Sequence, residues 1–449
     1  MAALHYNFLN MNMLTRLFDR VLHIRPEDNV PSGVAVNFKH NVFANTLDLM
    51  FFFFSDSIWS INTIMPVFAA TLTDSPFLIG LIPAVVNAGW FLPQLFMSGR
   101  ISKMPKVLPF SLKMGFLERM PYMCLPFLTL LIGKVDNQTV YWFLLLLMIW
   151  RGIGGGMSGL PWQELNARVI PISHRARFIG LSRIFGQFAG ILGSLLSIYL
   201  LGKFPYPQNY AIGFVVAAIS LWFSYASYSR NREPEPEVLS ESIEDETAKA
   251  HEQTWVLMKQ ILKKDSNFIR YLVSRSLAFL GNMASAFIAV YAIDRFNLGD
   301  AHAAIFTALL LISGILGYAV WGSLGDRIGP QKVVILSFTT WGLGLIVAML
   351  SQSLWVYYVV FAAFGLYTSG LNLGDTMLVM EIGDEKLRPT YLGMARTLTG
   401  MFLLLAPVLS GWLVQSFNYF VMFAVSLGFV VLSTILMSTV RDRPRKRAL

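Results

Sequence analysis

The chain has 449 residues, of which 55% are hydrophobic and only 14% are charged. Soluble domains contain roughly 25% charged residues, so this composition excludes an ordinary soluble protein and predicts a polytopic membrane protein. The formal charge of +9 would suit a nucleic-acid partner, but the cations are placed as membrane topology requires and no nucleic acid is expected.

The first 40 residues precede the first long apolar run and are expected to form a cytoplasmic segment. Between positions 4 and 22, apolar residues recur every three or four positions, which is typical of a helix lying in the membrane interface. A loosely ordered tail is the alternative.

Runs of about 20 mostly apolar residues predict about twelve membrane spans. Six fall within residues 41–229 and six within residues 266–440. Residues 230–265 are rich in Glu and Pro at their start and are expected to form a cytoplasmic linker, and residues 441–449 form a basic tail. The predicted fold is all-α, with twelve transmembrane helices in two six-helix bundles.

Basic residues are concentrated in alternate loops and in the tail. The loop from Arg100 to Lys106 is an example, whereas the opposite loops offer only Lys134, Lys203 and Arg295. Loops rich in Lys and Arg stay on the cytoplasmic side of a membrane. We therefore expect a multi-pass protein of the plasma membrane with both termini in the cytoplasm.

The two predicted bundles share a sequence repeat. IGLSR at Ile179–Arg183 corresponds to LGMAR at Leu392–Arg396, since 393 − 180 and 396 − 183 both equal 213. Duplicated six-helix units are typical of transporter folds, in which the substrate binds between the repeats near the middle of the membrane. The repeat therefore predicts two pseudo-symmetric bundles around a substrate site.

One loop carries a specific motif, GSLGDRIGPQK, from Gly322 to Lys332. Its glycines allow a sharp turn, and its charges belong at a membrane surface. The motif resembles the loop between the second and third helices of each half in the major facilitator superfamily, and the resemblance extends over roughly residues 40 to 440. RGIGGG, from Arg151 to Gly156, is similar to the fourth-helix motif of the family's drug/proton antiporters.

The resemblance implies that the first, fourth, seventh and tenth helices line a central cavity. These predicted helices carry stripes of polar and aromatic residues at helical spacing, for which packing is the alternative explanation. The residues expected in the cavity are Asp48, Phe52, Trp59, Asn87, Arg151, Ser158, Asn282, Phe364, Thr368 and Asn372.

Charged residues at mid-membrane depth are candidates for a role in function, because burying a charge in lipid is costly. Asp56 lies at the centre of the first predicted helix. Glu118 and Arg151 lie 17 and 16 residues from a predicted turn near Val135, so they are expected at one depth, together with Arg119. Asp56 and Glu118 are the predicted proton-binding residues, and structural ion pairing is the alternative.

A second group of charged residues lies near the predicted cytoplasmic ends of the helices. These residues are expected to form ion pairs between helices that break when the protein changes conformation. The group contains Glu164, Arg183, Asp326, Arg327, Asp375 and Arg396. We specifically expect Asp326 to pair with Arg183 across the two halves when the cytoplasmic side is closed.

The expected function is secondary transport of a small molecule by a monomer in the lipid bilayer, and not catalysis. Neither Gly-Lys pair continues as a P-loop, because Val135 and Phe204 follow. All six His lie outside the predicted spans or at their edges, so no metal and no cofactor besides a coupling proton is expected. Proton-coupled export of amphipathic compounds is favoured, uptake of a polar solute with H⁺ or Na⁺ is the alternative, and a non-transporting receptor is a third.

The Arg183 and Asp326 hypothesis predicts a charge-swap result. Arg183→Asp and Asp326→Arg should each impair solute flux in proteoliposomes, because each places like charges together. The double variant should partly restore flux. If both single variants and the double variant transport at the wild-type rate, the pairing is wrong.

Overall fold

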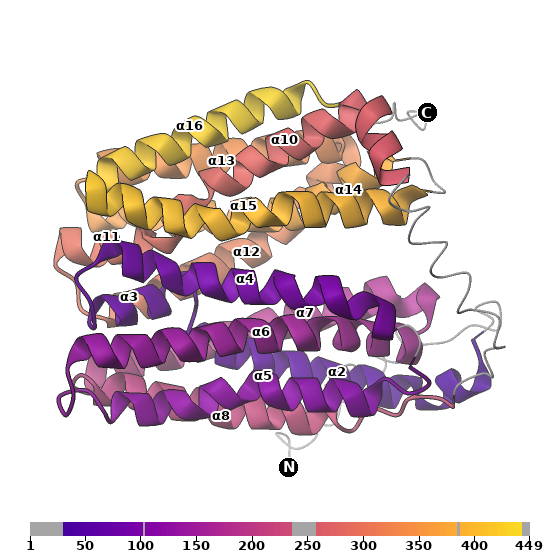
Figure 1. The fold of residues 1–449 in the computed structure, drawn as a ribbon, viewed down its shortest axis with the longest axis horizontal. Helices are drawn as coiled ribbons and strands as arrows, with labels where there is room; N and C mark the ends of the chain where they lie inside the picture. The colour runs from indigo at the N-terminus through magenta and orange to yellow at the C-terminus, as the bar shows by residue number, and fades with distance from the viewer. Residues whose placement is uncertain (1–29, 102–103, 236–256, 384–386, 442–449) are drawn as a thin grey trace, which may run out of the picture.

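The structure is a computed structural model that describes residues 30–101, 104–235, 257–383 and 387–441. Long helices run side by side along one direction (Figure 1). The interfacial helix expected between positions 4 and 22, and most of the basic tail, lie outside the described residues.

The N-terminal half contains seven named α-helices within the described residues. They are α2 (Ser32–Ile58), α3 (Ile64–Ala70), α4 (Pro76–Ile101), α5 (Leu108–Thr129), α6 (Asn137–Val169), α7 (Arg175–Lys203) and α8 (Gln208–Tyr228). The first helix begins at Ser32, so it reaches into the segment expected to precede the bundle.

The C-terminal half repeats this order after the linker. Its described helices are α10 (Ser266–Gly281), the short 3₁₀ helix η4 (Met283–Ala286), α11 (Ile288–Phe296), α12 (Ala301–Ile328), α13 (Pro330–Leu350), α14 (Leu354–Ile382), α15 (Arg388–Ser416) and α16 (Tyr419–Ser438). A helical stretch over residues 257–264 precedes α10 and buries Ile261 against the core.

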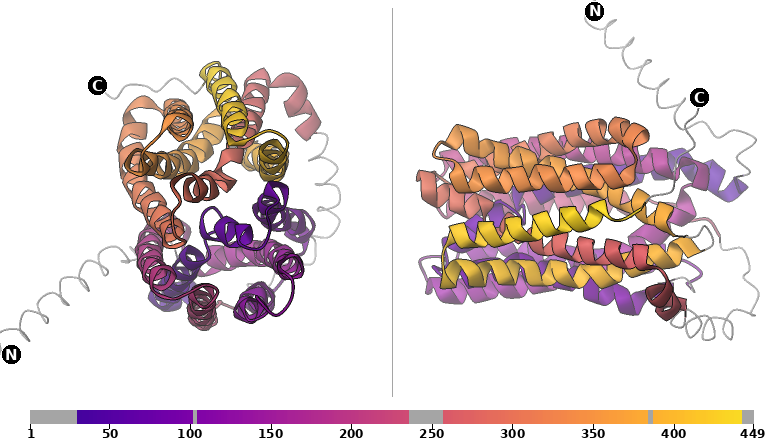
Figure 2. Two further views of the ribbon diagram at one scale, coloured as in Figure 1. Left: turned by 90° about the vertical axis from the view of Figure 1, so that its left-hand side faces the viewer. Right: turned by 90° about the horizontal axis from the view of Figure 1, so that it is seen from above.

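Seen end-on, the two halves form separate groups of helices (Figure 2). Within the described residues, nine helices are long and apolar enough to cross a membrane. Helices α2, α4 and α5 run parallel to these nine (Figure 1) and bring the number of spanning segments to twelve. In this count α10 and α11 together form one segment. Charged residues such as Asp48 in α2 and Arg119 in α5 interrupt the apolar runs of those two helices.

The first segment of each half is broken at a similar place, which the apolar runs did not predict. The first span was expected to be continuous from about residue 42 to residue 69, but α2 ends at Ile58 and α3 begins at Ile64. In the second half the break lies between Gly281 and Ile288. Both breaks contain Ser and Asn, residues with weak helix propensity whose side chains compete for backbone groups.

The internal repeat extends over whole helices. Both α7 and α15 contain 29 residues. Their first residues, Arg175 and Arg388, and their last, Lys203 and Ser416, differ by the same offset of 213 that relates the two short motifs. Residues at this offset therefore occupy equivalent positions in the two halves.

The glycines of RGIGGG allow close packing of α6 against α4 and α5. A Cβ atom at Gly156 would lie 2.4 Å from the carbonyl oxygen of Gly89, and one at Gly154 would lie 2.7 Å from the Cα of Glu118. Small residues let membrane helices approach closely and gain van der Waals contact. In this structure the motif therefore has a packing role.

The two ends of the molecule differ in how the halves meet. We call the end where α2 and α10 begin the linker end, and the opposite end the far end. At the far end, the hydroxyls of Thr63 and Thr307 form a 2.6 Å hydrogen bond between the halves. A Cβ at Gly80 of α4 would lie 2.4 Å from the carbonyl oxygen of Pro407 in α15. The halves are thus in close contact at the far end.

Contact between the halves is looser toward the linker end. Among the described residues, the hydrogen bonds between the halves lie at the far end, where Thr63 bonds Thr307 and Gln415 bonds Ser75 and Phe77. Together with the close contact at Gly80, this indicates a conformation that is closed at the far end and open at the linker end.

The close contact at Gly80 predicts that a single methyl group shifts this conformation. Gly80→Ala should disfavour far-end closure by about 1–3 kcal/mol because neither backbone can yield easily. Spin labels are attached at Lys134 and Gln352, in far-end loops of opposite halves, in a variant from which Cys124 has been removed. Pulsed electron paramagnetic resonance should then give a longer distance between the two labels. Gly428→Ala is the control, since its Cβ would meet nothing within 4 Å. An unchanged distance distribution in Gly80→Ala would contradict the prediction.

Candidate functional site

A cavity of about 540 Å³ lies in the linker-end portion of the N-terminal half. Helices α2, α4, α5, α6, α7, α8 and α15 supply its described lining, which consists of Asp48, Leu49, Phe52, Phe53, Trp90, Ser111, Gly115, Glu118, Arg119, Ser158, Gly159, Trp162, Gln163, Phe178, Ile179, Arg183, Tyr228 and Arg396. Of these residues, only Arg396 belongs to the C-terminal half. Of the four helices expected to line a central cavity, α2 and α6 contribute to the described lining of this cavity.

Asp48 is the buried acidic centre of the cavity wall, with 3% of its surface exposed. Its Oδ1 accepts a 2.6 Å hydrogen bond from the hydroxyl of Ser224, and its Oδ2 accepts a 3.2 Å bond from the indole of Trp162. Arg119 Nη2 lies 3.4 Å from Oδ1. Both carboxylate oxygens therefore have partners, as a buried charge requires.

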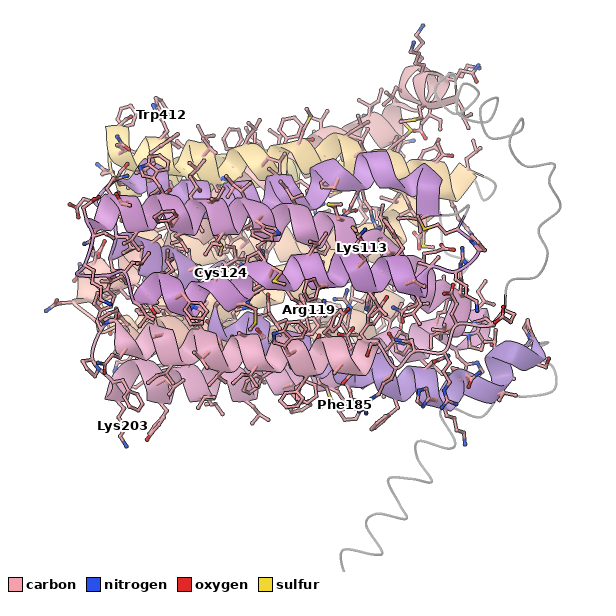
Figure 3. All side chains as sticks on the ribbon, turned by 60° about the horizontal axis from the view of Figure 1, so that its bottom comes forward. Lys113, Arg119, Cys124, Phe185, Lys203 and Trp412 are labelled. Carbon is pink, nitrogen blue, oxygen red and sulfur yellow. The ribbon has the colours of Figure 1, made fainter. Side chains whose placement is uncertain are left out.

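The N–H groups of the Arg119 side chain donate hydrogen bonds to acceptors on α5 and α8. Its Nη1 donates to the carbonyl of Gly115 at 3.0 Å, and its Nε donates to the carbonyl of Leu221 at 3.2 Å. The ring of Tyr225 lies 5.6 Å from the guanidinium carbon. Figure 3 shows Arg119 on α5 in the interior of the N-terminal half, between Cys124 and Lys113. Arg119 therefore acts as a fixed internal cation.

Glu118 faces α6 where the glycines bring the two helices together. Its Oε2 accepts a 2.5 Å hydrogen bond from the hydroxyl of Ser158 and lies 3.8 Å from Arg119 Nη1. The residue is 8% exposed and lines the cavity. Asp48 and Glu118 thus share one guanidinium, and the hydroxyl of Ser158 completes the surroundings of the second carboxylate.

A second, looser ion pair joins Asp56 to Arg151. The closest atoms, Asp56 Oδ1 and Arg151 Nη2, are 3.9 Å apart, and the Asp56 side chain is 42% exposed. Arg151 is more firmly held, because its guanidinium lies 4.0 Å from the ring centre of Trp59 and its Nε donates to the hydroxyl of Tyr122 at 2.5 Å. Asp56 is therefore the less constrained partner.

The expected single layer of charged residues is instead two clusters. Glu118 is beside Gly154, whereas Arg151 contacts Tyr122, which lies one helical turn beyond Glu118 on α5. The error arises because counting residues from a turn near Val135 ignores the different helix ends, at Thr129 for α5 and at Asn137 for α6.

The C-terminal half has its own buried ion pair. Arg275 Nε on α10 lies 3.1 Å from Asp375 Oδ1 on α14, and the hydroxyl of Tyr271 donates to the same oxygen at 2.7 Å. Arg275 also lies over the ring of Phe279, 4.1 Å from its centre. Asp375, expected in a gating pair, thus pairs within its own half.

The other residues expected in the cavity have varied positions. Phe52 and Ser158 line the cavity described above, and Asn87 is half-buried on α4. Trp59 is buried beneath Arg151, and Phe364 packs against the ring of Trp341 at 4.9 Å. Thr368 donates to the carbonyl of Gly365, Asn372 donates to the hydroxyl of Tyr318, and Asn282 caps α10 at the break.

Two of the residues expected to gate the linker end, Glu164 and Asp375, pair within their own halves here. Glu164 pairs with Arg168 on its own helix at 2.9 Å. Arg183 forms no ion pair with Asp326 among the described residues, and Asp326 and Arg327 are exposed near the end of α12. The predicted pairing belongs to a conformation closed at the linker end, so it stays a prediction.

Linker residue Glu233 makes contacts that the sequence did not reveal. Its carboxylate accepts hydrogen bonds from the backbone N–H groups of Val107 and Leu108 at the start of α5, and it pairs with Arg168 at the end of α6 at 3.3 Å. The side chain is 3% exposed. The beginning of the linker is thus tied to the N-terminal half.

Sequence reasoning missed the contribution of α8 and of Trp90. Ser224 binds Asp48, and Tyr228 lines the cavity from the last turn of α8. Ser220, Ser224 and Ser227 recur every three or four positions in that span, so a polar stripe was present there. Trp90 likewise lies three positions after Asn87 and four before Gln94 on α4, so the spacing of polar residues was a signal there too.

Comparisons with known proteins agree on one family. The family model for the Major Facilitator Superfamily matches residues 47–318 and 271–449. No curated protein matches the chain.

Solved structures with a similar fold include the D-xylose-proton symporter (14% identity, TM-score 0.68, covering 90% of this chain and 97% of that one) and the nucleoside transporter NupG (14%, 0.63, 89% and 99%). A bacterial homologue of the iron transporter ferroportin in an inward-facing state is also similar (16%, 0.64, 88% and 97%).

The position of Arg119 between two carboxylates predicts that its loss is destabilising. Arg119→Met leaves Asp48 and Glu118 without a shared cation, which should cost about 3–5 kcal/mol, as for other broken buried ion pairs. The melting temperature of the purified protein in detergent should fall, and Asp48→Asn in the same chain should recover part of the loss. Arg177→Met, at an exposed position on α7, is the control. Equal melting temperatures for Arg119→Met and wild type would refute the assignment.

Proposed function

This chain belongs to the Major Facilitator Superfamily, and on that premise we propose that it exports amphipathic compounds in exchange for protons. The family membership makes the chain a multi-pass membrane transporter of a small molecule. The assignment of proton coupling rests on the different surroundings of Asp56 compared with those of Asp48 and Glu118.

Asp56 is the carboxylate best suited to exchange a proton during transport. Asp48 accepts three hydrogen bonds and Glu118 accepts one, whereas the contact of Asp56 with a described partner is the 3.9 Å approach of Arg151, and Asp56 is 42% exposed. A proton must reach its carrier from water, and a carrier with few fixed partners loses least when it becomes neutral. Glu118, which lines the cavity, is the second candidate.

Protonation of Asp56 changes the balance of charge around Arg151. The guanidinium keeps its contacts with Trp59 and Tyr122 but loses its only anionic partner among the described residues. Both Asp56 and Trp59 lie beside the break between α2 and α3. A local charge change at a helix break can bias two conformations that differ little in free energy.

The walls of the cavity suit a ligand with an apolar body. Phe52, Trp90, Trp162 and Phe178 surround the polar groups of Asp48 and Glu118. The volume of about 540 Å³ lies within the range of roughly 300–1,000 Å³ that is usual for small-molecule pockets. These features support an amphipathic substrate.

The proposed direction depends on the proposed orientation. The described chain begins and ends at the linker end (Figure 1), the end expected to be cytoplasmic from its basic residues. A cavity near that end takes up substrate from the cytoplasm, as an exporter requires. Uptake of a small polar solute with H⁺ or Na⁺ is the alternative, favoured by the likeness in fold to a D-xylose-proton symporter.

Coupling through Asp56 predicts a specific transport defect. Asp56→Asn should abolish accumulation of fluorescent amphipathic dyes driven by a pH gradient in proteoliposomes, while exchange of dye without a gradient continues, because only proton exchange is lost. Asp74→Asn is the matched control at an exposed position between α3 and α4.

Three outcomes separate the alternatives. Unchanged uphill transport in Asp56→Asn removes that residue from the coupling mechanism. Transport driven by a Na⁺ gradient and not by a pH gradient would contradict proton coupling. Absence of any solute flux in the wild type would favour a receptor.

A further inference from the structure

Arg183 and Arg396 are equivalent residues of the two repeats, and both line the same cavity. They are separated by the offset of 213 that relates α7 to α15. Arg396 is the one described lining residue from the C-terminal half. The repeat therefore brings two guanidinium groups, one from each half, to the wall of one binding space.

Neither arginine has a carboxylate partner within the part of the chain that the structure describes. Both side chains are exposed, and no hydrogen bond or ion pair joins either of them to another described residue. The two acids of the cavity wall are already engaged, because Asp48 binds Ser224, Trp162 and Arg119 while Glu118 binds Ser158. The charge that the cavity offers to a ligand is therefore positive.

We propose that Arg183 and Arg396 together form a subsite for an anionic group of the substrate, such as a carboxylate, sulfonate or phosphate. Guanidinium groups suit this task because their N–H donors match the geometry of such oxyanions. The substrate is then an organic anion whose apolar body contacts Phe52, Trp90 and Phe178. This inference rests on the proposed function in one respect, namely that the cavity is the substrate site.

The same pair of residues gives the substrate a role in closing the linker end. Residues related by the pseudo-twofold axis lie on opposite sides of that axis, so approach of the two halves at this end brings Arg183 and Arg396 closer. Two guanidinium groups repel one another more strongly as water is excluded. An anion held between them removes this repulsion, so closure is favoured with substrate bound.

Binding of ligands that differ only in charge tests the subsite directly. The probes are naphthalene carboxylate and the uncharged naphthalene carboxamide, titrated at neutral pH into the purified full-length protein in an uncharged detergent and followed by calorimetry. The wild type should bind the carboxylate about tenfold more tightly than the carboxamide, the gain expected from a charge-assisted hydrogen bond.

The variants assign that preference to the two arginines. Arg183→Gln and Arg396→Gln should each remove most of it, the double variant should bind both probes equally, and lysine at either position should restore part of it. Unchanged binding of the carboxamide shows that the variants remain folded. Arg177→Gln, an exposed position on α7 outside the cavity lining, should keep the full preference.

Equal binding of the two probes by the wild type, no binding of the carboxylate, or a preference that survives in the double variant would overturn the proposal. The last result would leave Arg183 as a gating residue for Asp326. Because the measurement uses no ion gradient, it is independent of proton coupling. A carboxylate preference combined with failure of the Asp56→Asn prediction would reject only the coupling mechanism.

Discussion

A charged side chain within a bilayer has to find its partners inside the protein, and this requirement organises the N-terminal half. Arg119 is held by α5, by a carbonyl of α8 and by the carboxylates of Asp48 and Glu118. The contacts with Leu221 and Asp48 join α5 to α8 and to α2, so the ion cluster ties these three helices together. The wall of the cavity is built from the same residues.

Close helix packing makes this arrangement possible. Without side chains at Gly154 and Gly156, α6 approaches α5 and α4 closely enough for Ser158 to reach Glu118. Trp162, one turn further along α6, reaches Asp48. The glycine motif thus acts on the chemistry of the cavity through distance, because a wider separation would deprive Glu118 of Ser158 and Asp48 of Trp162.

The two halves share a fold but differ in their polar interiors. The N-terminal half has the Asp48 cluster and the looser pair of Asp56 and Arg151, whereas the described C-terminal half has the pair of Arg275 and Asp375. In our proposal the N-terminal half carries the proton and most of the substrate wall, and the repeat adds one arginine from each half.

The sequence by itself determined the twelve spans, the two bundles and the equivalence of α7 with α15, because apolar length and a repeated motif are local properties of the chain. It also predicted Asp56, Glu118 and Arg151 as charges at mid-membrane depth and Asp48 as part of the polar face of the first helix. Only the tertiary structure decided their partners, since Ser224, Trp162 and Tyr122 come from other helices and pairing depends on depth and rotation. The helix breaks, the two separate clusters and the shared cavity of Arg183 and Arg396 likewise arise from packing between distant segments.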